Sequence, residues 1–561
     1  MHTNMNQNGR RAVLQTLAAA GAAAIGRADD KKMSSNSLLG PNPVVETSSG
    51  KVKGFNEPGV AAFLGIPYGA STAGANRFRP PVKREPWTGI RNCLSYGHSC
   101  PQAGTGVIEN DEGGRNSDED AFLLYRTNGW IRGEDCLCLN VWTPSTGSSS
   151  RKRPVMVYMH GGGYTGGSGN DLLCYNGASL ARNHDVVVVT HNHRLNLFGY
   201  LNLADIGGDQ YASSGNVGML DIVAVLEWVR DNIAAFGGDP GNVLIYGQSG
   251  GGGKVSHLMA MPAAKGLFHR AVVQSGSALR SGSAAAAAEK AAAILQELQI
   301  SRNSLDKLRS LPASDLQRVQ PIVERRLAAA AGRGSGLGGW GPIVDERTVP
   351  SHPFDPGAPA VSAGVPMLIG TCLNEMVNGT DNPERETLND DELIKRVSAR
   401  YREGAADIVA AYRKEYPKET PFGIWAAISA ANMRQNAIAQ AERKAAQGGA
   451  PAYMYLYAWR TPALGGKIGT FHSSEITFVF DNATLCPHYS GNTPDALALS
   501  SKMGEAWATF ARSGRPGHGG LPAWQAFTAE NRATMILDSP CVVRNGPERV
   551  GLASLKEVAR L

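Results

Sequence analysis

"NVLIYGQSGGGGKVSHLMAMP" (residues 242–262) joins a run of branched apolar residues to a glycine-rich turn and then to a helix-like segment. One interpretation of the turn is a phosphate-binding loop. That loop needs a glycine, four further residues, then Gly-Lys followed by Ser or Thr. With Gly253-Lys254 as the closing pair, Gln248 occupies the glycine position and Val255 the hydroxyl position. This register does not fit a phosphate-binding loop.

The second interpretation is the pattern G-x-S-x-G, which residues 247–251 satisfy with Ser249 at the centre. A strained turn between a strand and a helix exposes the serine hydroxyl, and small neighbours remove side-chain clashes. The flanking segments supply that context, because "NVLIYG" is strand-like and "GGKVSHLMAMP" is helix-like. The stretch therefore predicts a nucleophilic serine.

Further buried strands are predicted on the amino-terminal side of this stretch. "RPVMVYMHGGG" (153–163) and "DVVVVTHNHRL" (185–195) are β-branched runs of the kind found in strands covered on both faces. Between the second run and the "NVLIYG" strand, residues 218–242 are apolar at helical spacing and close with Gly-Gly-Asp-Pro. The order strand, helix, strand predicts a right-handed crossover and a mostly parallel sheet.

The carboxy-terminal half continues this alternation. Strand-like runs lie at 271–277, 365–371 and 451–459, and the segments 284–331 and 386–447 are rich in Ala, Glu, Arg and Leu, which favours helical insertions. There is no internal repeat and no long linker. We therefore expect one α/β catalytic domain with a helical cap, spanning residues 44–561, after a flexible lead at 29–43.

Composition excludes some partners. The 561 residues carry 55 Lys and Arg against 49 Asp and Glu, a net charge of +6, with no basic block interleaved with aromatic residues. Nucleic acid is therefore not an expected partner. No segment has the roughly 20 consecutive apolar residues that span a bilayer, and we expect neither a metal nor an organic cofactor.

The amino terminus resembles a twin-arginine export signal. Arg10 and Arg11 precede a weakly apolar stretch at 12–25 and small residues near Ala28. A disordered, alanine-rich tail is the alternative. We expect residues 1–28 to direct export, which places the mature protein in the periplasm or outside the cell.

A nucleophilic serine needs donors for the oxyanion that carbonyl attack creates. In "MHGGGYTGG", residues 160–167 follow the predicted strand, and the glycines allow backbone N–H groups to approach a substrate closely. The N–H groups of Gly162 and Gly163, with that of Gly250 after the serine, are the predicted donors. A merely flexible turn is the alternative.

The serine also needs a base, and the base needs an acid. "LIGTCLNEM" places Glu375 just after a buried strand, although a loop glutamate is often only a solvated surface charge. Among twelve histidines, His472 lies on a Gly/Ser-flanked loop before an apolar run. His257 is expected on the helix after the turn, and His191 and His193 at a strand end could line the pocket.

The order Ser249, Glu375, His472 along the chain is that of the α/β-hydrolase fold. The chain resembles the type-B carboxylesterase and cholinesterase family, and the likeness covers nearly everything after about residue 44. The motifs that carry it are "FLGIPYG" (63–69) with "RFRPP" (77–81), "EDCLCLNVW" (134–142), "HGGGYTGGSG" (160–169), residues 215–252, and "WATFARSGRP" (507–516) to "LPAWQAF" (521–527).

The resemblance implies a nucleophile at Ser249, an acid at Glu375, a base at His472 and oxyanion donors at Gly162, Gly163 and Gly250. It also implies a disulfide between Cys100 and Cys136, although the nearby Cys93 leaves the choice of partner open, and Cys138 has no assigned partner. Family members often have Glu-Ser-Ala at the turn. Here Gln248 removes a negative charge beside the serine, which implies a weaker attraction for cationic esters.

The sequence thus predicts a serine carboxylic ester hydrolase that acts through an acyl-enzyme on small to medium uncharged alkyl or aryl esters. A carbamate or amide hydrolase with the same triad is one alternative, because the acyl chemistry is shared. A non-catalytic adhesion or binding protein on the same fold is another, and the intact triad argues against it. The motifs leave the oligomeric state undetermined.

Overall fold

The computed structural model of the chain describes residues 41–102, 131–147, 152–330, 339–375, 377–380 and 382–558. The predicted export signal, residues 1–28, and most of the flexible lead at 29–43 lie outside these ranges. The boundaries at 28 and 43 therefore stay predictions.

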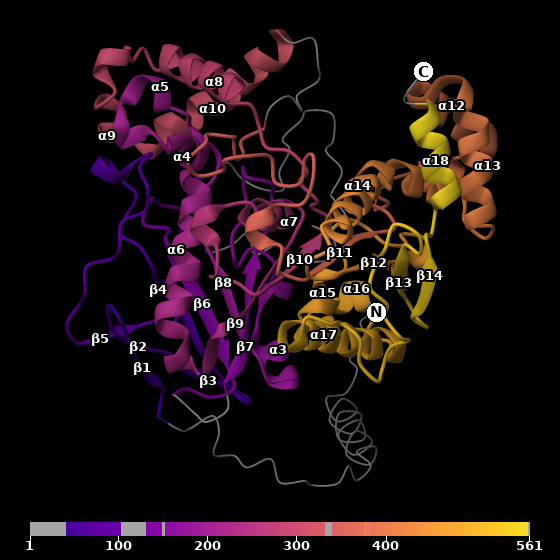
Figure 1. Cartoon of the computed structure of the whole chain (residues 1–561), viewed down its shortest axis with the longest axis horizontal. Coiled ribbons are helices and arrows are strands. Elements are labelled where there is room, and N and C mark those ends of the chain that lie inside the picture. Colours follow the sequence, from indigo (N-terminus) through magenta and orange to yellow (C-terminus); the bar gives the residue numbers. More distant parts are fainter. Residues whose placement is uncertain are drawn as a thin grey trace, which may run out of the picture.

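One large sheet organises the described residues, in the order β14-β13-β12-β11-β10-β9-β7-β8-β6-β4-β3 (Figure 1). Every neighbouring pair from β13 to β8 is parallel, and the pairs at both edges are antiparallel. The strands are β3 (Phe55–Glu57), β4 (Val60–Pro67), β6 (Cys138–Thr143), β7 (Arg153–Met159), β8 (Val187–His191), β9 (Gly238–Gln248), β10 (Arg270–Gln274), β11 (Met367–Cys372), β12 (Ala452–Tyr457), β13 (Ala533–Leu537) and β14 (Val542–Asn545). A small second sheet holds β1 (Val44–Thr47), β2 (Gly50–Lys53) and β5 (Ile90–Asn92).

Strand β7 illustrates why these sequences form buried strands. Val155, Val157 and Met159 belong to the core on one face of the sheet, whereas Met156 and Tyr158 belong to the core on the other. Successive side chains of a strand point to opposite faces, so a strand covered on both sides has a nearly continuous run of apolar residues. The continuous β-branched runs in the sequence follow from this double burial.

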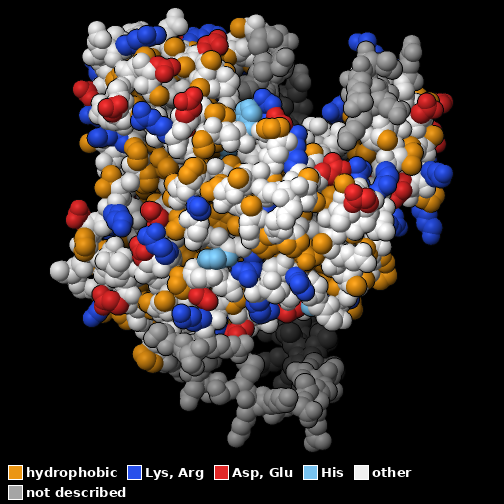
Figure 2. Space-filling view, viewed as in Figure 1, with side chains coloured by type: hydrophobic (Ala, Val, Ile, Leu, Met, Phe, Trp, Pro, Cys, Tyr) orange, Lys and Arg blue, Asp and Glu red, His pale blue; other side chains and the backbone are white. Residues whose placement is uncertain are grey.

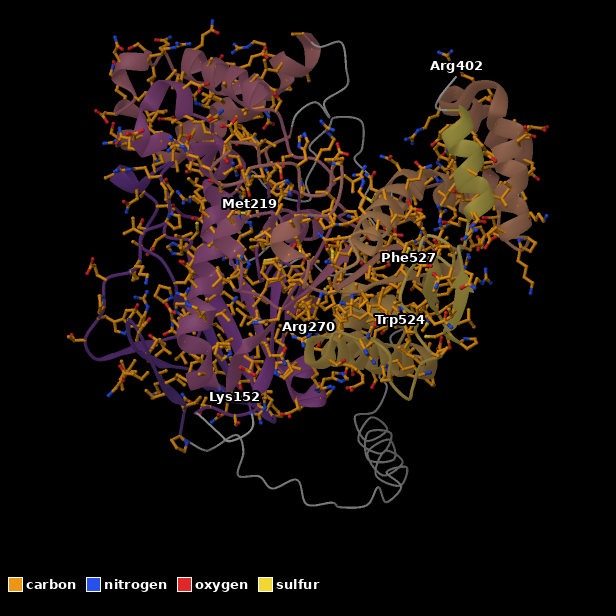
Figure 3. All side chains as sticks on the ribbon, viewed as in Figure 1. Lys152, Met219, Arg270, Arg402, Trp524 and Phe527 are labelled. Carbon is orange, nitrogen blue, oxygen red and sulfur yellow. The ribbon has the colours of Figure 1, made fainter. Side chains whose placement is uncertain are left out.

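Helices cover both faces of the large sheet. α6 (Val217–Asn232), α7 (Gly250–Leu258) and α14 (Pro421–Ala446) contribute to one core, and α3 (Ala178–His184) and α17 (Pro494–Ser513) to the other. Figure 3 labels Met219 on α6 and Arg270 at the start of β10. The other α-helices are short or belong to the insertions: α4 (Asn196–Tyr200), α5 (Ala204–Gly207), α8 (Ala284–Glu297), α9 (Lys307–Ser310), α10 (Ala313–Ala330), α11 (Glu384–Thr387), α12 (Asp390–Tyr401), α13 (Ala405–Glu415), α15 (Ile476–Val479), α16 (Pro487–Ser490) and α18 (Arg549–Val558).

The two predicted helical insertions form separate groups. α8 and α10 pack on one another, and α12 packs on α13, against which the carboxy-terminal α18 also lies. Figure 1 places α8 to α10 at the upper left and α12, α13 and α18 at the upper right, with α14 leading back to the sheet. None of the helices within the described residues has the length and apolarity that a bilayer crossing requires.

The predicted fold class is confirmed, since each predicted parallel strand is present with a helix between β8 and β9. β9 begins at Gly238, four residues before the predicted start at 242, because Gly238 pairs with Arg153 of β7. On the face drawn in Figure 2, acidic and basic side chains are interspersed.

Candidate active site

The glycine-rich turn lies between β9 and α7, as the sequence predicts. Ser249 has φ 56° and ψ −122°, a conformation that costs a non-glycine residue on the order of 1–3 kcal/mol. Its N–H donates to the carbonyl of Gln274 on β10 (2.8 Å), and its carbonyl accepts from the N–H of Gly253 (3.1 Å). The neighbouring strand and the helix thus hold the strained residue in place.

The glycines on either side of Ser249 let the first turn of α7 touch the segment after β7. A Cβ atom at Gly250 would overlap the carbonyl oxygen of Gly163, and one at Gly251 would overlap that of Met159. A Cβ atom at Gly247 would lie 2.6 Å from the backbone carbon of Gly251. Side chains at these positions would push the two backbones apart.

The predicted oxyanion donors come together at this contact. Gly162 and Gly163 have φ values of +77° and +62°. The carbonyl of Gly162 accepts from the N–H of Gly166 (3.1 Å), and the carbonyl of Gly161 accepts from Nδ1 of His160 (2.9 Å). In a trans peptide unit the C=O and the N–H point in opposite directions. Because the carbonyls of Gly161 and Gly162 are bonded within the loop, the N–H groups of Gly162 and Gly163 point away from its interior.

Within the described part of the chain, no hydrogen bond uses the N–H of Gly162, Gly163 or Gly250. Protein N–H groups near a buried site are rarely left without an acceptor. Three such donors beside one serine form a site prepared for a negatively charged oxygen.

The predicted acid and base are paired. Oε2 of Glu375 lies 2.6 Å from Nδ1 of His472. Oε1 of Glu375 accepts from the hydroxyl of Ser275 (2.6 Å) and from the N–H of Cys372 (2.7 Å). The carboxyl is fully buried and is not a solvated surface charge, whereas the His472 side chain is 20% exposed. The bond to Glu375 keeps the proton on Nδ1 and leaves Nε2 as an acceptor.

The competing histidines lie elsewhere. His257 is on α7, where its Nδ1 contacts the carbonyl of Gly253 (2.8 Å) and the hydroxyl of Tyr164 (3.1 Å). His191 and His193 are buried, and the His193 ring lies 4.7 Å from that of His160, between centroids. Burial lowers the pKa of His257 to about 4 and that of His191 to about 3.

Four further residues surround the site, and of these the sequence analysis placed only Gln248 beside the serine. Ser275 directly follows β10 and bonds Glu375, and the amide nitrogen of Gln248 lies 3.2 Å from Nε2 of His472. The ammonium of Lys254 bonds the loop after β7. Glu475 is fully buried three residues after His472. A serine after a strand has no sequence pattern that would predict a role at the site. The three-residue spacing of His472 and Glu475 could have indicated that Glu475 lies near the base.

Glu475 adds a second carboxyl behind the first. Its Oε2 accepts from the thiol of Cys372 (2.9 Å). Burial, and secondarily the negative charge of Glu375, raise the pKa of Glu475 to about 7. This carboxyl therefore takes up a proton close to neutral pH.

Comparison with known proteins shows a family and several esterases that this chain resembles. A family model described as the carboxylesterase family matches residues 41–552. The para-nitrobenzyl esterase of Bacillus subtilis is 36% identical over 90% of this chain and 96% of its own. The phenmedipham hydrolase of Pseudarthrobacter oxydans is 30% identical over 88% and 95%. A solved esterase of Clostridium hathewayi, whose title says that it hydrolyses aliphatic aromatic polyesters, has a TM-score of 0.79 and 35% identity over 92% of this chain and 98% of that one.

We predict that Glu475 makes stability depend on pH. The folded-state pKa of this acid is raised above its ordinary value of 4.5. Its stabilising contribution is therefore complete below about pH 4.5 and is lost as the pH rises through 7. Glu475→Gln does not titrate, so the free energy of unfolding of the unchanged protein should fall relative to this variant between pH 5 and pH 8. The relative loss should reach up to about 3 kcal/mol.

Urea unfolding at several pH values measures the difference. Glu46→Gln is the control, because the Glu46 side chain is 65% exposed and its replacement should leave the pH profile unchanged. A difference between Glu475→Gln and the unchanged protein that stays constant from pH 5 to pH 8 would contradict the prediction.

Proposed function

The chain belongs to the carboxylesterase family and is a serine ester hydrolase, and on this premise we propose that Ser249, Glu375 and His472 form its catalytic triad. One observation carries the assignment: Glu375 and His472 are bonded at 2.6 Å, and His472 lies against Gln248, the residue before the strained Ser249. Gly162, Gly163 and Gly250 supply the oxyanion donors.

The reaction then follows in two halves. Nε2 of His472 takes the proton of Ser249 Oγ as Oγ attacks the carbon of the ester carbonyl. The π electron pair of the carbonyl moves onto the carbonyl oxygen, which becomes the oxyanion. The imidazolium is stabilised by the carboxylate of Glu375. Collapse of the tetrahedral intermediate expels the alcohol oxygen, which takes the proton from His472. Water repeats the sequence on the acyl-enzyme and releases the acid.

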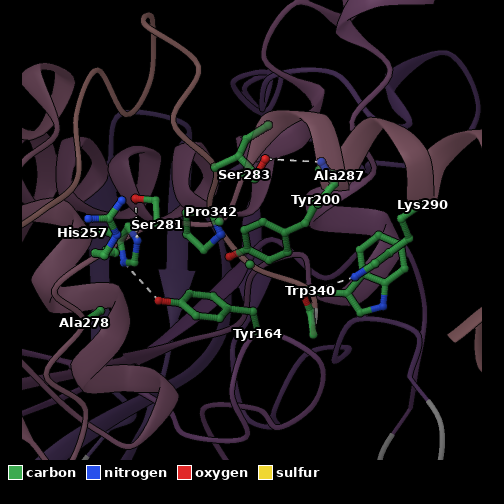
Figure 4. Close-up of a pocket in the computed structure, with 16 residues that line it drawn as sticks. Tyr164, Tyr200, His257, Ala278, Ser281, Ser283, Ala287, Lys290, Trp340 and Pro342 are labelled. Atoms are coloured by element: carbon green, nitrogen blue, oxygen red, sulfur yellow. Dashed lines mark hydrogen bonds between the residues drawn. The ribbon is translucent and has the colours of Figure 1, made fainter. Parts of the chain in front are cut away.

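A cavity beside the oxyanion loop supports aryl and alkyl esters as substrates. It has a volume of about 320 Å³ and is lined by Tyr164, which follows the donor Gly163, and by Tyr200, Trp340, Pro342 and Ile343. Figure 4 shows the rings of Tyr164, Tyr200 and Trp340 around this space. The lining also includes the cations Arg280 and Lys290, which disfavour a cationic group, and the aromatic walls suit a small or medium one.

The residue before the nucleophile supports a preference for uncharged esters. Gln248 is buried, and its amide lies 3.2 Å from His472 Nε2. A carboxylate here would attract a cationic substrate in a medium of low dielectric constant, and a neutral amide does not.

We also propose that residues 1–28 are an export signal and that Cys100 and Cys136 form a disulfide in the exported protein. Both thiols are buried and free in the structure. A hydrogen bond from Cys136 to Cys100, together with burial, raises the pKa of Cys136. Adjacent thiols of this kind join when the compartment is oxidising.

The first prediction from the triad concerns turnover of p-nitrophenyl acetate and butyrate. Ser249→Ala should lower kcat at least about 10,000-fold, because no other hydroxyl occupies the strained turn. His472→Ala should have a similar effect. Labelling by a fluorophosphonate, located by mass spectrometry, should fall on the Ser249 peptide.

Ser256→Ala is the matched control, since Ser256 is a buried serine on the same helix whose hydroxyl bonds the carbonyl of Gly252 (2.9 Å). This variant should keep the label and the turnover. Turnover that persists in Ser249→Ala would refute the triad. Faster turnover of p-nitrophenyl carbamates or anilides than of the esters would instead favour the carbamate or amide alternative.

Substrate charge gives a second prediction. Gln248→Glu should raise kcat/KM for butyrylthiocholine relative to p-nitrophenyl butyrate by about 3- to 10-fold, because a buried carboxylate attracts the cationic ester. The ratio of the two kcat/KM values for each protein is the measurement. An unchanged ratio in a folded variant would show that residue 248 does not set charge preference.

The proposed export of the protein gives a third prediction. In a bacterium with a twin-arginine pathway, the full chain should reach the periplasm or medium, cut near Ala28, with a tryptic fragment linking Cys100 to Cys136. A variant with Arg10→Lys and Arg11→Lys should stay in the cytoplasm with reduced thiols. Export of this variant would contradict the signal, and a fragment that links Cys93 instead would correct the pairing.

A further inference from the structure

Lys254 is a buried lysine on the helix that begins at the nucleophile. It is completely inaccessible to solvent, five residues after Ser249 on α7. Its Nζ donates to the carbonyl of His160 (2.9 Å) and to the carbonyl of Gly163 (2.8 Å), and it lies 5.4 Å from the centroid of the Tyr164 ring. Lysine is almost never fully buried without partners that repay its lost hydration. Its two acceptors are therefore the reason to look for a role.

The two acceptors bracket the oxyanion loop. The carbonyl of His160 precedes the donors Gly162 and Gly163, and the carbonyl of Gly163 follows them. One ammonium thus bonds both ends of a four-residue turn whose last two residues, Gly162 and Gly163, have positive φ. Glycine has little conformational preference of its own, so an external bond of this kind fixes the turn more than its sequence does.

Lys254 also joins this turn to the third donor. Gly250 opens the same helix α7 on which Lys254 lies, one turn further along. A displacement of the loop relative to the helix would change the distance between Gly250 and the other two donors. The bonds from Lys254 resist that displacement, as does the contact between the backbones of Gly250 and Gly163.

The surroundings favour a lysine that makes hydrogen bonds over one that carries a free charge. The ionisable groups with an electrostatic influence on Lys254, or under its influence, are Asp171, His160, His191 and His193. Burial lowers the pKa of Lys254 to about 7, against a weaker opposing effect of Asp171. A neutral amine still has two hydrogens, enough for both carbonyls, so the bridge does not require the charge.

We propose that Lys254 is a positioning residue that bonds both ends of the His160–Gly163 turn and thereby fixes the N–H groups of Gly162 and Gly163 relative to that of Gly250. The proposal rests on the proposed esterase triad. This role explains why a lysine follows the glycine run although the sequence does not have the spacing of a phosphate-binding loop. Lys254 touches no substrate and acts only through the donors.

The test is Lys254→Met, which keeps an apolar chain of similar length and removes the donor. We expect kcat for p-nitrophenyl butyrate to fall about 10- to 100-fold, while KM changes little. This fall in kcat is no larger than the one caused by removing an oxyanion donor. A trifluoromethyl ketone forms a hemiketal with the serine and leaves its oxygen in the oxyanion hole. Its affinity should fall by the same factor as kcat/KM, because both report binding of the oxyanion.

The chain offers a matched control in Lys444 on α14. This lysine is also buried and also bonds backbone carbonyls, those of Ser362 (3.2 Å) and Ala363 (2.8 Å). Burial lowers its pKa to about 8. Lys444→Met should lower Tm but leave kcat and the affinity for the trifluoromethyl ketone unchanged, which separates the loss of a buried lysine from the loss of this one.

If Lys254→Met does not fold, Lys254→Gln replaces it, since its shorter amide reaches one carbonyl and should restore part of the activity. A folded Lys254 variant with the kcat and ketone affinity of the unchanged protein would overturn the proposal. A loss in Lys254→Met matched by an equal loss in Lys444→Met would also overturn it. Failure of the triad itself is distinct, because Ser249→Ala would then retain turnover.

Discussion

The site depends on one contact between two stretches of backbone. The turn after β7 and the first turn of α7 touch at Gly163 and Gly250, and again at Met159 and Gly251, at separations that no side chain at either helix position would permit. This approach brings N–H groups from two segments, 87 residues apart at 163 and 250, toward one point. Backbone donors cannot be retuned by changing a side chain, so their placement depends on how closely the two backbones pack. The strained conformation of Ser249 follows from the same constraint, since its residue must connect a buried strand to a helix held against that turn.

The order of the strands in the sheet determines where the other residues of the site lie. β7, β9, β10, β11 and β12 are neighbours with parallel strands, so their carboxyl ends meet at one edge. The oxyanion turn follows β7, the nucleophile follows β9, Ser275 follows β10 and Glu375 follows β11, whereas His472 comes from the longer segment after β12. Because the cores on both faces fix these strands, each group is held by packed structure and not by its own loop. A hydrogen bond of 2.6 Å between Glu375 and His472 across two different connections requires that rigidity.

The sequence predicted the elements whose physical signal is local. The buried parallel strands β7 and β8 carry runs of apolar residues on both faces, and the glycines around Ser249 mark positions where a Cβ has no room. Residues whose role depends on long-range contact were harder to assign. Ser275 is an ordinary serine until β11 brings Glu375 to it, and Glu375 alone resembled a surface charge until its three bonds were located. Lys254 gave a misleading signal, because Gly-Lys after a glycine run resembles a phosphate loop, and only the fold brings the carbonyls of residues 160 and 163 to its ammonium.

The ionisable groups around the site suit a reaction that begins neutral and separates charge only in the transition state. Attack by Ser249 creates an oxyanion and an imidazolium at once, and in a medium of low dielectric constant each must find fixed compensation. The N–H groups compensate the first and Glu375 the second. A further carboxylate at residue 248 would help the imidazolium but would oppose the oxyanion, and the neutral amide of Gln248 avoids that conflict. Glu475, whose pKa is about 7, lies behind Glu375. Its negative charge develops only as the pH rises through neutrality, and in its protonated form it adds no repulsion to the carboxylate that orients His472.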